Sequence, residues 1–195
     1  MYRAVPTALL LAPLLLALNA CTPPAPKKEI VGLRTFQYQG GDVRSGSVDY
    51  PGSPPAGGPY NALWQSCGAY TAPIYDEYAV HTLARGAVWA TYQPGLAATE
   101  LTRLVAVLKT PIEVTVPQPE GSQQKTPTKK TVTALSLLSP RENLPAPIVL
   151  TVWNAQVSAQ SADDENLRLF VETYGLAQDA PESGAGCAGG FDGTR

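Results

Sequence analysis

The stretch of residues 31–60 limits the fold of this chain more than any other part of the sequence. It is rich in Gly, Ser and Pro and ends in the run YPGSPPAGGPY. Proline lacks a backbone donor and glycine disfavours regular elements, so this density excludes a regular helix and interrupts sheet ladders. A disordered linker usually lacks the aromatic residues found here, which are Phe36, Tyr38, Tyr50 and Tyr60. We therefore expect an ordered but irregular arm that lies over the surface of a domain.

Regular structure follows the arm. Residues 86–92 have the β-branched and aromatic content of a strand. Thr99 caps a predicted helix whose apolar side chains, at positions 101, 104, 105 and 108, share one face. Residues 112–116 and 132–138 are predicted strands, and residues 148–157 form a third that is apolar on both faces and hence central. Residues 117–130 between them show no apolar pattern and indicate a long solvated loop.

A second helix is expected over residues 162–174, with Ser161 and Asp164 as a capping box. Its side chains at positions 167, 170, 171 and 174 repeat at helical spacing and form one stripe. The predicted fold class is therefore α+β: a mainly antiparallel sheet with two helices packed on one face, preceded by the irregular arm. The chain of 195 residues fits a single globular domain over residues 31–195.

The first residues carry an export signal. Arg3 precedes an apolar run over residues 8–18, too short for a membrane span and interrupted by Pro13. The tripeptide before Cys21 resembles the bacterial lipobox, in which the cysteine is diacylated and becomes the mature N-terminus. We expect residues 1–20 to be a signal peptide and residues 21–30 to be the lipidated cysteine with a Pro-rich tether. The domain is then exported and anchored to the cell membrane or outer membrane by lipid on Cys21.

Charge and histidine content exclude several classes of function. The formal net charge is −2, so nucleic-acid binding through bulk electrostatics and a polybasic membrane patch are not expected. A single histidine excludes motifs with two imidazoles, such as HExxH.

Several motifs resemble the bacterial family called domain of unknown function 3105, over roughly residues 48–187. They are the Pro-rich run ending at Tyr60, the segment WxxCGxY from Trp64, and the segment VHxLxxGxV from Val80. Later landmarks of the resemblance are Ser139-Pro140-Arg141, the strand around Trp153, Phe170, Pro181-Glu182 and Cys187.

The chain departs from that family where the family carries ligand-type side chains. The family's Gly-Pro-His ends here in Tyr60, and its His-x-Leu-Glu-His-Gly is here His81 followed by Ala84 and Arg85. The resemblance implies a transition-metal site built from three imidazoles and a carboxylate. Of those ligands, this chain keeps His81 alone. The residues at the other positions do not replace them, because Arg85 repels a cation and a protonated Tyr60 is a poor ligand. We expect a degenerate site around Tyr60, His81 and Arg85.

Cys67 and Cys187 are the cysteines that remain after lipidation of Cys21. An even pair in an exported protein predicts a disulfide. Two alternatives stay open: free thiols, or a site for a soft metal that joins both cysteines to His81.

His81 is predicted just before a strand, close in sequence to Asp76 and Glu77. Three interpretations stay open: a structural histidine bonded to backbone, a binding or metal ligand, and a general base oriented by one of those carboxylates. Arg85 is a candidate partner of Asp76 or Glu77, or of a small anion bound beside Tyr60. The predicted core and rim aromatics are Trp64, Trp89, Tyr92 and Trp153. A glycan platform built from Trp64, Tyr70 and Tyr75 is the alternative.

The sequence predicts an envelope lipoprotein whose domain is a non-enzymatic binding or structural module without a cofactor. Its partners would be membrane lipid through Cys21 and an envelope protein, a glycan or a small ligand. The alternative is a protein that handles copper or zinc through His81. A hydrolase that uses His81 as its base is a third interpretation.

Overall fold

The computed structural model describes residues 28–117 and 126–195. Its elements in chain order are β1 (Arg34–Thr35), β2 (Gly68–Ala69), α1 (Asp76–Ala84), β3 (Val88–Tyr92), α2 (Ala98–Leu108), β4 (Ile112–Val116), β5 (Thr128–Val132), β6 (Ser136–Pro140), β7 (Ile148–Val152), β8 (Ala155–Ala159) and α3 (Glu165–Tyr174). The fold is α+β, as predicted.

A mixed six-stranded sheet with the order β1-β8-β7-β3-β6-β2 forms the centre of the domain. The pairs from β1 to β3 are antiparallel, whereas β6 runs parallel to both β3 and β2. Every residue of β7 is buried. This strand has the sequence IVLTV, and its β-branched side chains suit a position covered on both faces. The prediction that the apolar run at residue 148 is central is confirmed.

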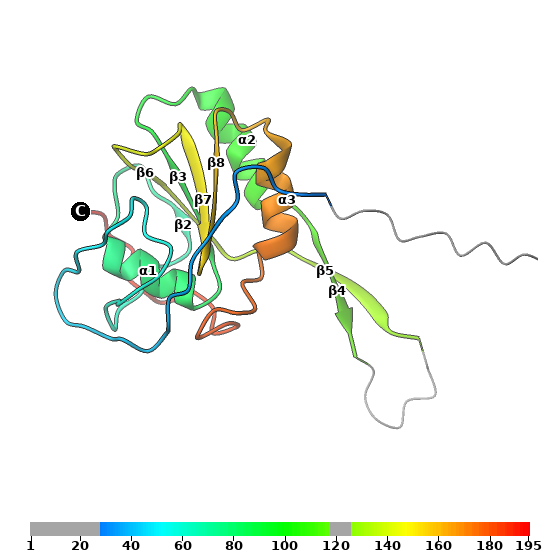
Figure 1. Ribbon diagram of the computed structural model, residues 1–195, viewed down its shortest axis with the longest axis horizontal. Coiled ribbons are helices and arrows are strands. Elements are labelled where there is room, and N and C mark those ends of the chain that lie inside the picture. Colours follow the sequence, from blue (N-terminus) through cyan, green and yellow to red (C-terminus); the bar gives the residue numbers. More distant parts are fainter. Residues whose placement is uncertain (1–27, 118–125) are drawn as a thin grey trace, which may run out of the picture.

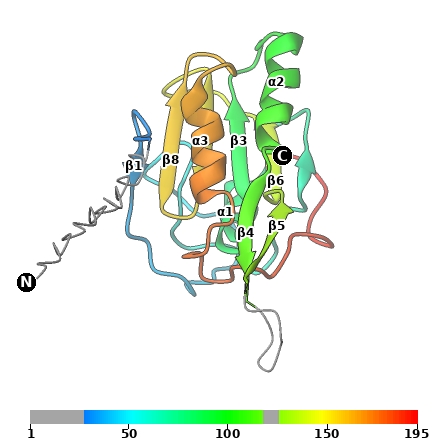
Figure 2. The ribbon, with the colours of Figure 1, turned by 90° about the vertical axis from the view of Figure 1, so that its right-hand side faces the viewer.

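Helices cover both faces of this sheet. Figure 1 shows α2 and α3 together on one side, and α1 with the C-terminal segment on the other. In Figure 2, α2 and α3 stand in front of β8 and β3, and α1 lies behind. The buried stripe of α3 consists of Leu167, Phe170 and Val171, and the Asp164 side chain caps the helix by accepting from the Asn166 amide at 2.9 Å.

The strands β4 and β5 form a separate antiparallel ribbon that projects from the body of the domain (Figures 1 and 2). The predicted loop over residues 117–130 is wrong at its C-terminal end, because residues 128–130 belong to β5. The other residues of that loop, 118–125, lie outside the described part of the chain.

The arm before β2 is mostly irregular, as its composition predicts. Its short strand β1 extends the sheet beside β8, and Val43 forms an isolated bridge with Tyr60. Asn154, in the turn after β7, fixes the arm by accepting from the amides of Phe36 at 2.9 Å and Tyr38 at 2.6 Å. These two backbone amides have no partner strand in a sheet, and Asn154 satisfies them instead.

Two predicted strands were wrong in detail, and one helix was missed. The expected strand over residues 132–138 is divided, with Val132 ending β5 in the ribbon and Ser136 beginning β6 in the main sheet. The expected strand over residues 148–157 is a hairpin of β7 and β8, whose turn contains Asn154 at a φ of 66°. The third helix, α1, was not predicted, and it places His81 in a helix rather than before a strand.

The predicted signal peptide, Cys21 and most of the tether lie outside the described residues. Within the described ranges, no helix is long and apolar enough to cross a membrane.

Candidate functional site

Three of the predicted site residues meet at a carboxylate that comes from the distant C-terminal segment. Tyr60 ends the arm, while His81 and Arg85 stand one turn apart at the end of α1. Glu182 approaches them because its backbone amide bonds the carbonyl of Ala84 at 2.8 Å. The arm, α1 and the segment after α3 therefore build one cluster, which we call the Glu182 cluster.

The carboxylate of Glu182 is contacted by all three side chains. The Tyr60 hydroxyl donates to Oε1 at 3.0 Å. His81 Nε2 lies 3.2 Å from Oε2, and a guanidinium nitrogen of Arg85 lies 3.3 Å from the same oxygen. A single carboxylate thus faces an imidazole, a phenol and a fixed positive charge.

Aromatic rings enclose the His81 imidazole. The Tyr60 ring stacks on it at a centroid distance of 4.6 Å, and the Trp64 ring meets it edge-on at 5.7 Å. Arg85 lies 4.0 Å above the Trp64 ring centroid, within the range of a cation–π contact. Tyr60 and His81 are both buried, with 1% and 5% of their surfaces exposed, so the ring positions are fixed by packing.

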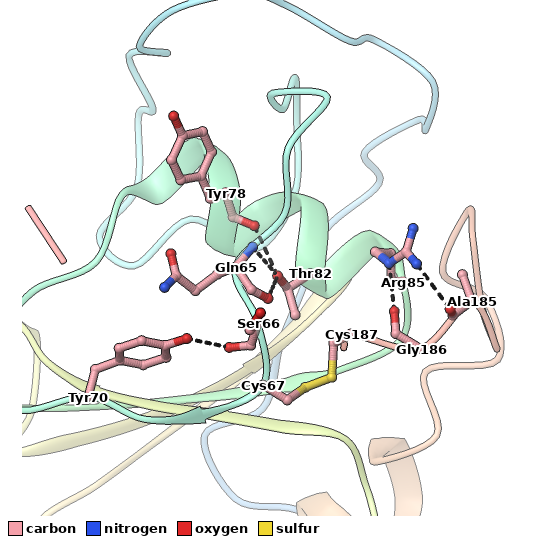
Figure 3. The surroundings of a disulfide bond; sticks show 10 residues. All are labelled: Gln65, Ser66, Cys67, Tyr70, Tyr78, Thr82, Arg85, Ala185, Gly186 and Cys187. Atoms are coloured by element: carbon pink, nitrogen blue, oxygen red, sulfur yellow. Dashed lines mark hydrogen bonds between the residues drawn. A yellow bond between two sulfur atoms is a disulfide. The ribbon is translucent and has the colours of Figure 1, made fainter. Parts of the chain in front are cut away.

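The disulfide predicted from the sequence is present, and it anchors the turn to which Arg85 is hydrogen-bonded. It joins Cys67 to Cys187 with a Cα–Cα distance of 5.4 Å. Figure 3 shows Arg85 bonded to the two residues that precede Cys187: Nε donates to the Gly186 carbonyl at 2.6 Å and a terminal nitrogen donates to the Ala185 carbonyl at 3.0 Å. The disulfide and Arg85 therefore anchor the same turn.

The C-terminal segment then runs along residues 64–66. The amide of Ser66 donates to Phe191 at 2.9 Å, and the amide of Phe191 donates to Trp64 at 2.8 Å. Within the described ranges, four buried side-chain polar atoms have no hydrogen-bond partner: Trp64 Nε1, Gln65 Oε1, Ser66 Oγ and His81 Nδ1. Three of them belong to this strip, and the fourth belongs to His81, whose ring contacts that of Trp64. Native structures leave few such atoms, so their concentration marks this place as chemically unusual.

Burial and hydrogen bonding act in opposite directions on Glu182. Partial burial raises the pKa of this carboxyl, but the hydrogen bonds from His81 and Tyr60, with the Arg85 charge, outweigh it and hold the pKa below its ordinary value. Burial, together with the bond to Glu182, raises the pKa of the Tyr60 phenol. The cluster therefore keeps an ionised carboxylate and a protonated phenol at neutral pH.

The structure places Asp76 and Glu77 away from this cluster. Both are in the first turn of α1, and Asp76 makes a two-pronged ion pair with Arg141, one of whose bonds is 2.9 Å long. The interpretation of Arg85 as a partner of Asp76 or Glu77 was therefore wrong. The reason is the helix: more than two turns separate these carboxylates from Arg85, which follows the last residue of α1, so they lie at opposite ends of the element.

The aromatic residues considered as a glycan platform are engaged in other contacts. The Tyr70 hydroxyl donates to the Ser66 carbonyl at 2.6 Å, and the Tyr75 ring packs against Tyr78 at 5.3 Å. Trp64 lies between Arg85 and His81.

The residues present do not fit the metal site that the family resemblance implies. His81 is the one imidazole, and Arg85 approaches the same Glu182 oxygen that a cation would need. No group of three His, Cys, Asp or Glu residues able to hold a metal ion occurs among residues 28–117 and 126–195. Both cysteines are in the disulfide, which also removes the soft-metal alternative for their sulfurs.

Glu182 was not singled out as a site residue from the sequence. Its signal was the Pro181-Glu182 landmark of the family resemblance, but its partners lie about a hundred residues earlier in the chain, with His81 at a separation of 101 positions.

The fold and the cluster together define an α+β domain with a disulfide between Cys67 and Cys187, in which a buried histidine and an arginine contact the same carboxylate. The family model described as "Protein of unknown function (DUF3105)" matches residues 43–189, and the chain belongs to this family. The matched range includes every residue of the Glu182 cluster and both cysteines. No curated protein and no solved structure matches the chain significantly.

Proposed function

We propose that this protein is an envelope lipoprotein, anchored by lipid on Cys21, whose domain is a non-enzymatic binding module centred on the Glu182 cluster. The export signal and lipobox-like sequence before Cys21 support the anchor. The disulfide between Cys67 and Cys187 supports an oxidising compartment outside the cytoplasm, because thiols of cytosolic proteins are kept reduced.

The observation that carries the binding role is the set of buried polar atoms without partners on residues 64–66 and on His81. Each such atom costs about 1–3 kcal/mol when it is left unbonded. They include a ring donor on Trp64, an amide acceptor on Gln65 and a hydroxyl on Ser66. A small polar ligand with both donors and acceptors would complete these bonds after residues 188–193 move aside.

The contacts of His81 argue against a hydrolase. Its Nε2 is engaged with Glu182, and its Nδ1 forms no hydrogen bond with a hydroxyl or thiol of the described residues. A general base needs such contact with the proton that it removes. The remaining alternative, handling of copper or zinc, is favoured by the free Nδ1 of His81 and opposed by the Arg85 charge beside it.

Metal stoichiometry separates the two candidate functions. The purified protein, its His81→Ala variant and its Glu182→Gln variant are each loaded with copper or zinc, desalted and analysed for metal. We expect no metal above the level of the His81→Ala variant. Stoichiometric metal that is lost in both variants would refute the binding-module proposal and establish metal handling.

The anchor is tested separately by detergent phase partitioning. We expect the wild-type protein in the detergent phase and a Cys21→Ser variant in the aqueous phase. Recovery of both proteins in the same phase would show that Cys21 carries no lipid.

A further inference from the structure

A cavity is lined by residues 47–53 of the arm, by residues 75–77 at the start of α1, and by Arg141 and Arg195. Its volume is about 520 Å³, within the range of pockets that hold small molecules. None of the four side chains of the Glu182 cluster lines it. The cavity is therefore a separate feature of the molecule, and a ligand bound there would be independent of the proposed function.

Glu77 forms part of its wall and has no partner. The residue is 8% exposed, and its carboxylate forms no hydrogen bond or ion pair with the described residues. Its backbone carbonyl accepts from the Asn61 amide at 3.2 Å. Neither carboxylate oxygen is among the completely inaccessible atoms without partners, so the accessible part of this buried side chain opens into the cavity. Buried carboxylates are normally paired, because burial of an unpaired charge is costly.

The neighbouring acid shows the contrast. Asp76 also lines the cavity, but Arg141 neutralises it through two bonds. The position of Glu77 in the first turn of α1 gives it the favourable field of the helix N-terminus. That field lowers the cost of the charge but supplies no hydrogen-bond donor to its oxygens. The carboxylate of Glu77 is thus left with unused acceptor capacity facing an open space.

The other groups around the cavity define the ligand chemistry. Asp49, which is exposed at its rim, adds a second negative charge, and the rings of Tyr50 and Tyr75 supply aromatic surface suited to a cation. The hydroxyl of Tyr50 is already bonded to the Pro59 carbonyl. Two arginines complete the charged residues of the wall: Arg141, which is paired with Asp76, and Arg195, which is exposed.

A metal ion does not fit this place, because the carboxylates are not grouped as a set of three donors anywhere in the described ranges. The volume also exceeds that of a single ion. We propose that this cavity binds a small organic cation whose ammonium group is hydrogen-bonded by the carboxylate of Glu77.

The test is a calorimetric titration of the purified protein with benzylamine and with 1,4-diaminobutane, with benzyl alcohol as the uncharged analogue. We expect saturable binding of an amine and none of the alcohol. Glu77→Gln keeps the size of the side chain but removes the charge, and it should weaken amine binding by about tenfold or more. Glu29→Gln makes the same charge change at an exposed position outside the cavity and should bind like the wild type.

A second variant tests the proposal even if the substitution of the buried Glu77 disturbs the fold. Asp49 is exposed, so Asp49→Asn should fold normally and weaken amine binding by about two- to fivefold. His81→Ala should leave amine binding unchanged, which separates this site from the Glu182 cluster. The proposal is overturned if neither amine binds, if benzyl alcohol binds as tightly as benzylamine, or if the folded Glu77→Gln variant retains wild-type affinity.

Discussion

Removal of the disulfide gives the largest stability change that can be worked out from this structure. The bond joins residues 120 positions apart, Cys67 and Cys187. In the chain-entropy model, a loop of that length removes about 16 cal/mol/K from the unfolded chain, or about 5 kcal/mol at 25 °C. Replacement of both cysteines by alanine should therefore lower the free energy of unfolding by up to about 5 kcal/mol.

The native contacts near the bond indicate where this change originates. The Cys67 amide bonds the Cys187 carbonyl at 3.3 Å, and Phe191 is bonded on both sides of its peptide to residues 64 and 66. These bonds do not need the sulfurs, so the variant should fold with the same topology. The loss then comes mainly from the greater freedom of the unfolded chain.

Urea unfolding under non-reducing conditions measures the effect for the wild type and for the Cys67→Ala, Cys187→Ala double variant. We expect a lower midpoint and a steeper dependence on urea, because the unfolded variant exposes more surface. The control is wild-type protein whose cysteines have been reduced and alkylated, because it lacks the disulfide but carries no alanine substitution. A loss below about 1 kcal/mol in the double variant would refute the entropic reasoning and would indicate residual structure in the unfolded chain.

Three further predictions address the cluster and its surroundings. Because the pKa of Glu182 is held below its ordinary value, the ionised carboxylate stabilises the fold fully above about pH 4.3, and this stabilisation is lost as the pH falls through the lowered pKa. Glu182→Gln should therefore unfold at a lower temperature than the wild type at pH 7. A difference in unfolding temperature that stays constant down to pH 3 would contradict this. Gly190→Ala would place a Cβ 2.5 Å from the Trp64 carbonyl oxygen, so urea unfolding should show a loss of about 1–3 kcal/mol, and an unchanged midpoint would exclude the clash. Arg141→Met should cost about 3 kcal/mol because it leaves Asp76 largely buried without its partner, and a double-mutant cycle with Asp76→Asn should recover most of this loss.

The elements that the sequence predicted well are those with one buried face. The apolar stripe of α3, at Leu167, Phe170 and Val171, repeats at helical spacing because the opposite face is exposed to water. The helix α1 carries no such signal. Residues 79–84 are all buried, so the helix has almost no polar face from which a period could be read.

The boundaries that were wrong depend on where the chain turns. The hairpin between β7 and β8 contains no glycine or proline, and Asn154 takes the left-handed conformation instead. Both arms of the hairpin are buried, so their apolar run reads as one strand. Similarly, Val132 and Ser136 are close in sequence but belong to different sheets, because the chain leaves the projecting ribbon between them.

The amino-acid sequence is enough to predict the irregular arm, the α+β class, the amphipathic helices, the family and the pair of cysteines. These properties follow from local composition, from short periods, or from motifs whose residues lie close together. The tertiary structure alone decided that Glu182 is the common partner of Tyr60, His81 and Arg85, and that Arg141 rather than Arg85 neutralises Asp76. Such partnerships join residues far apart in the chain, and they are set by the order of strands in the sheet and by the course of the C-terminal segment, neither of which leaves a local pattern in the sequence.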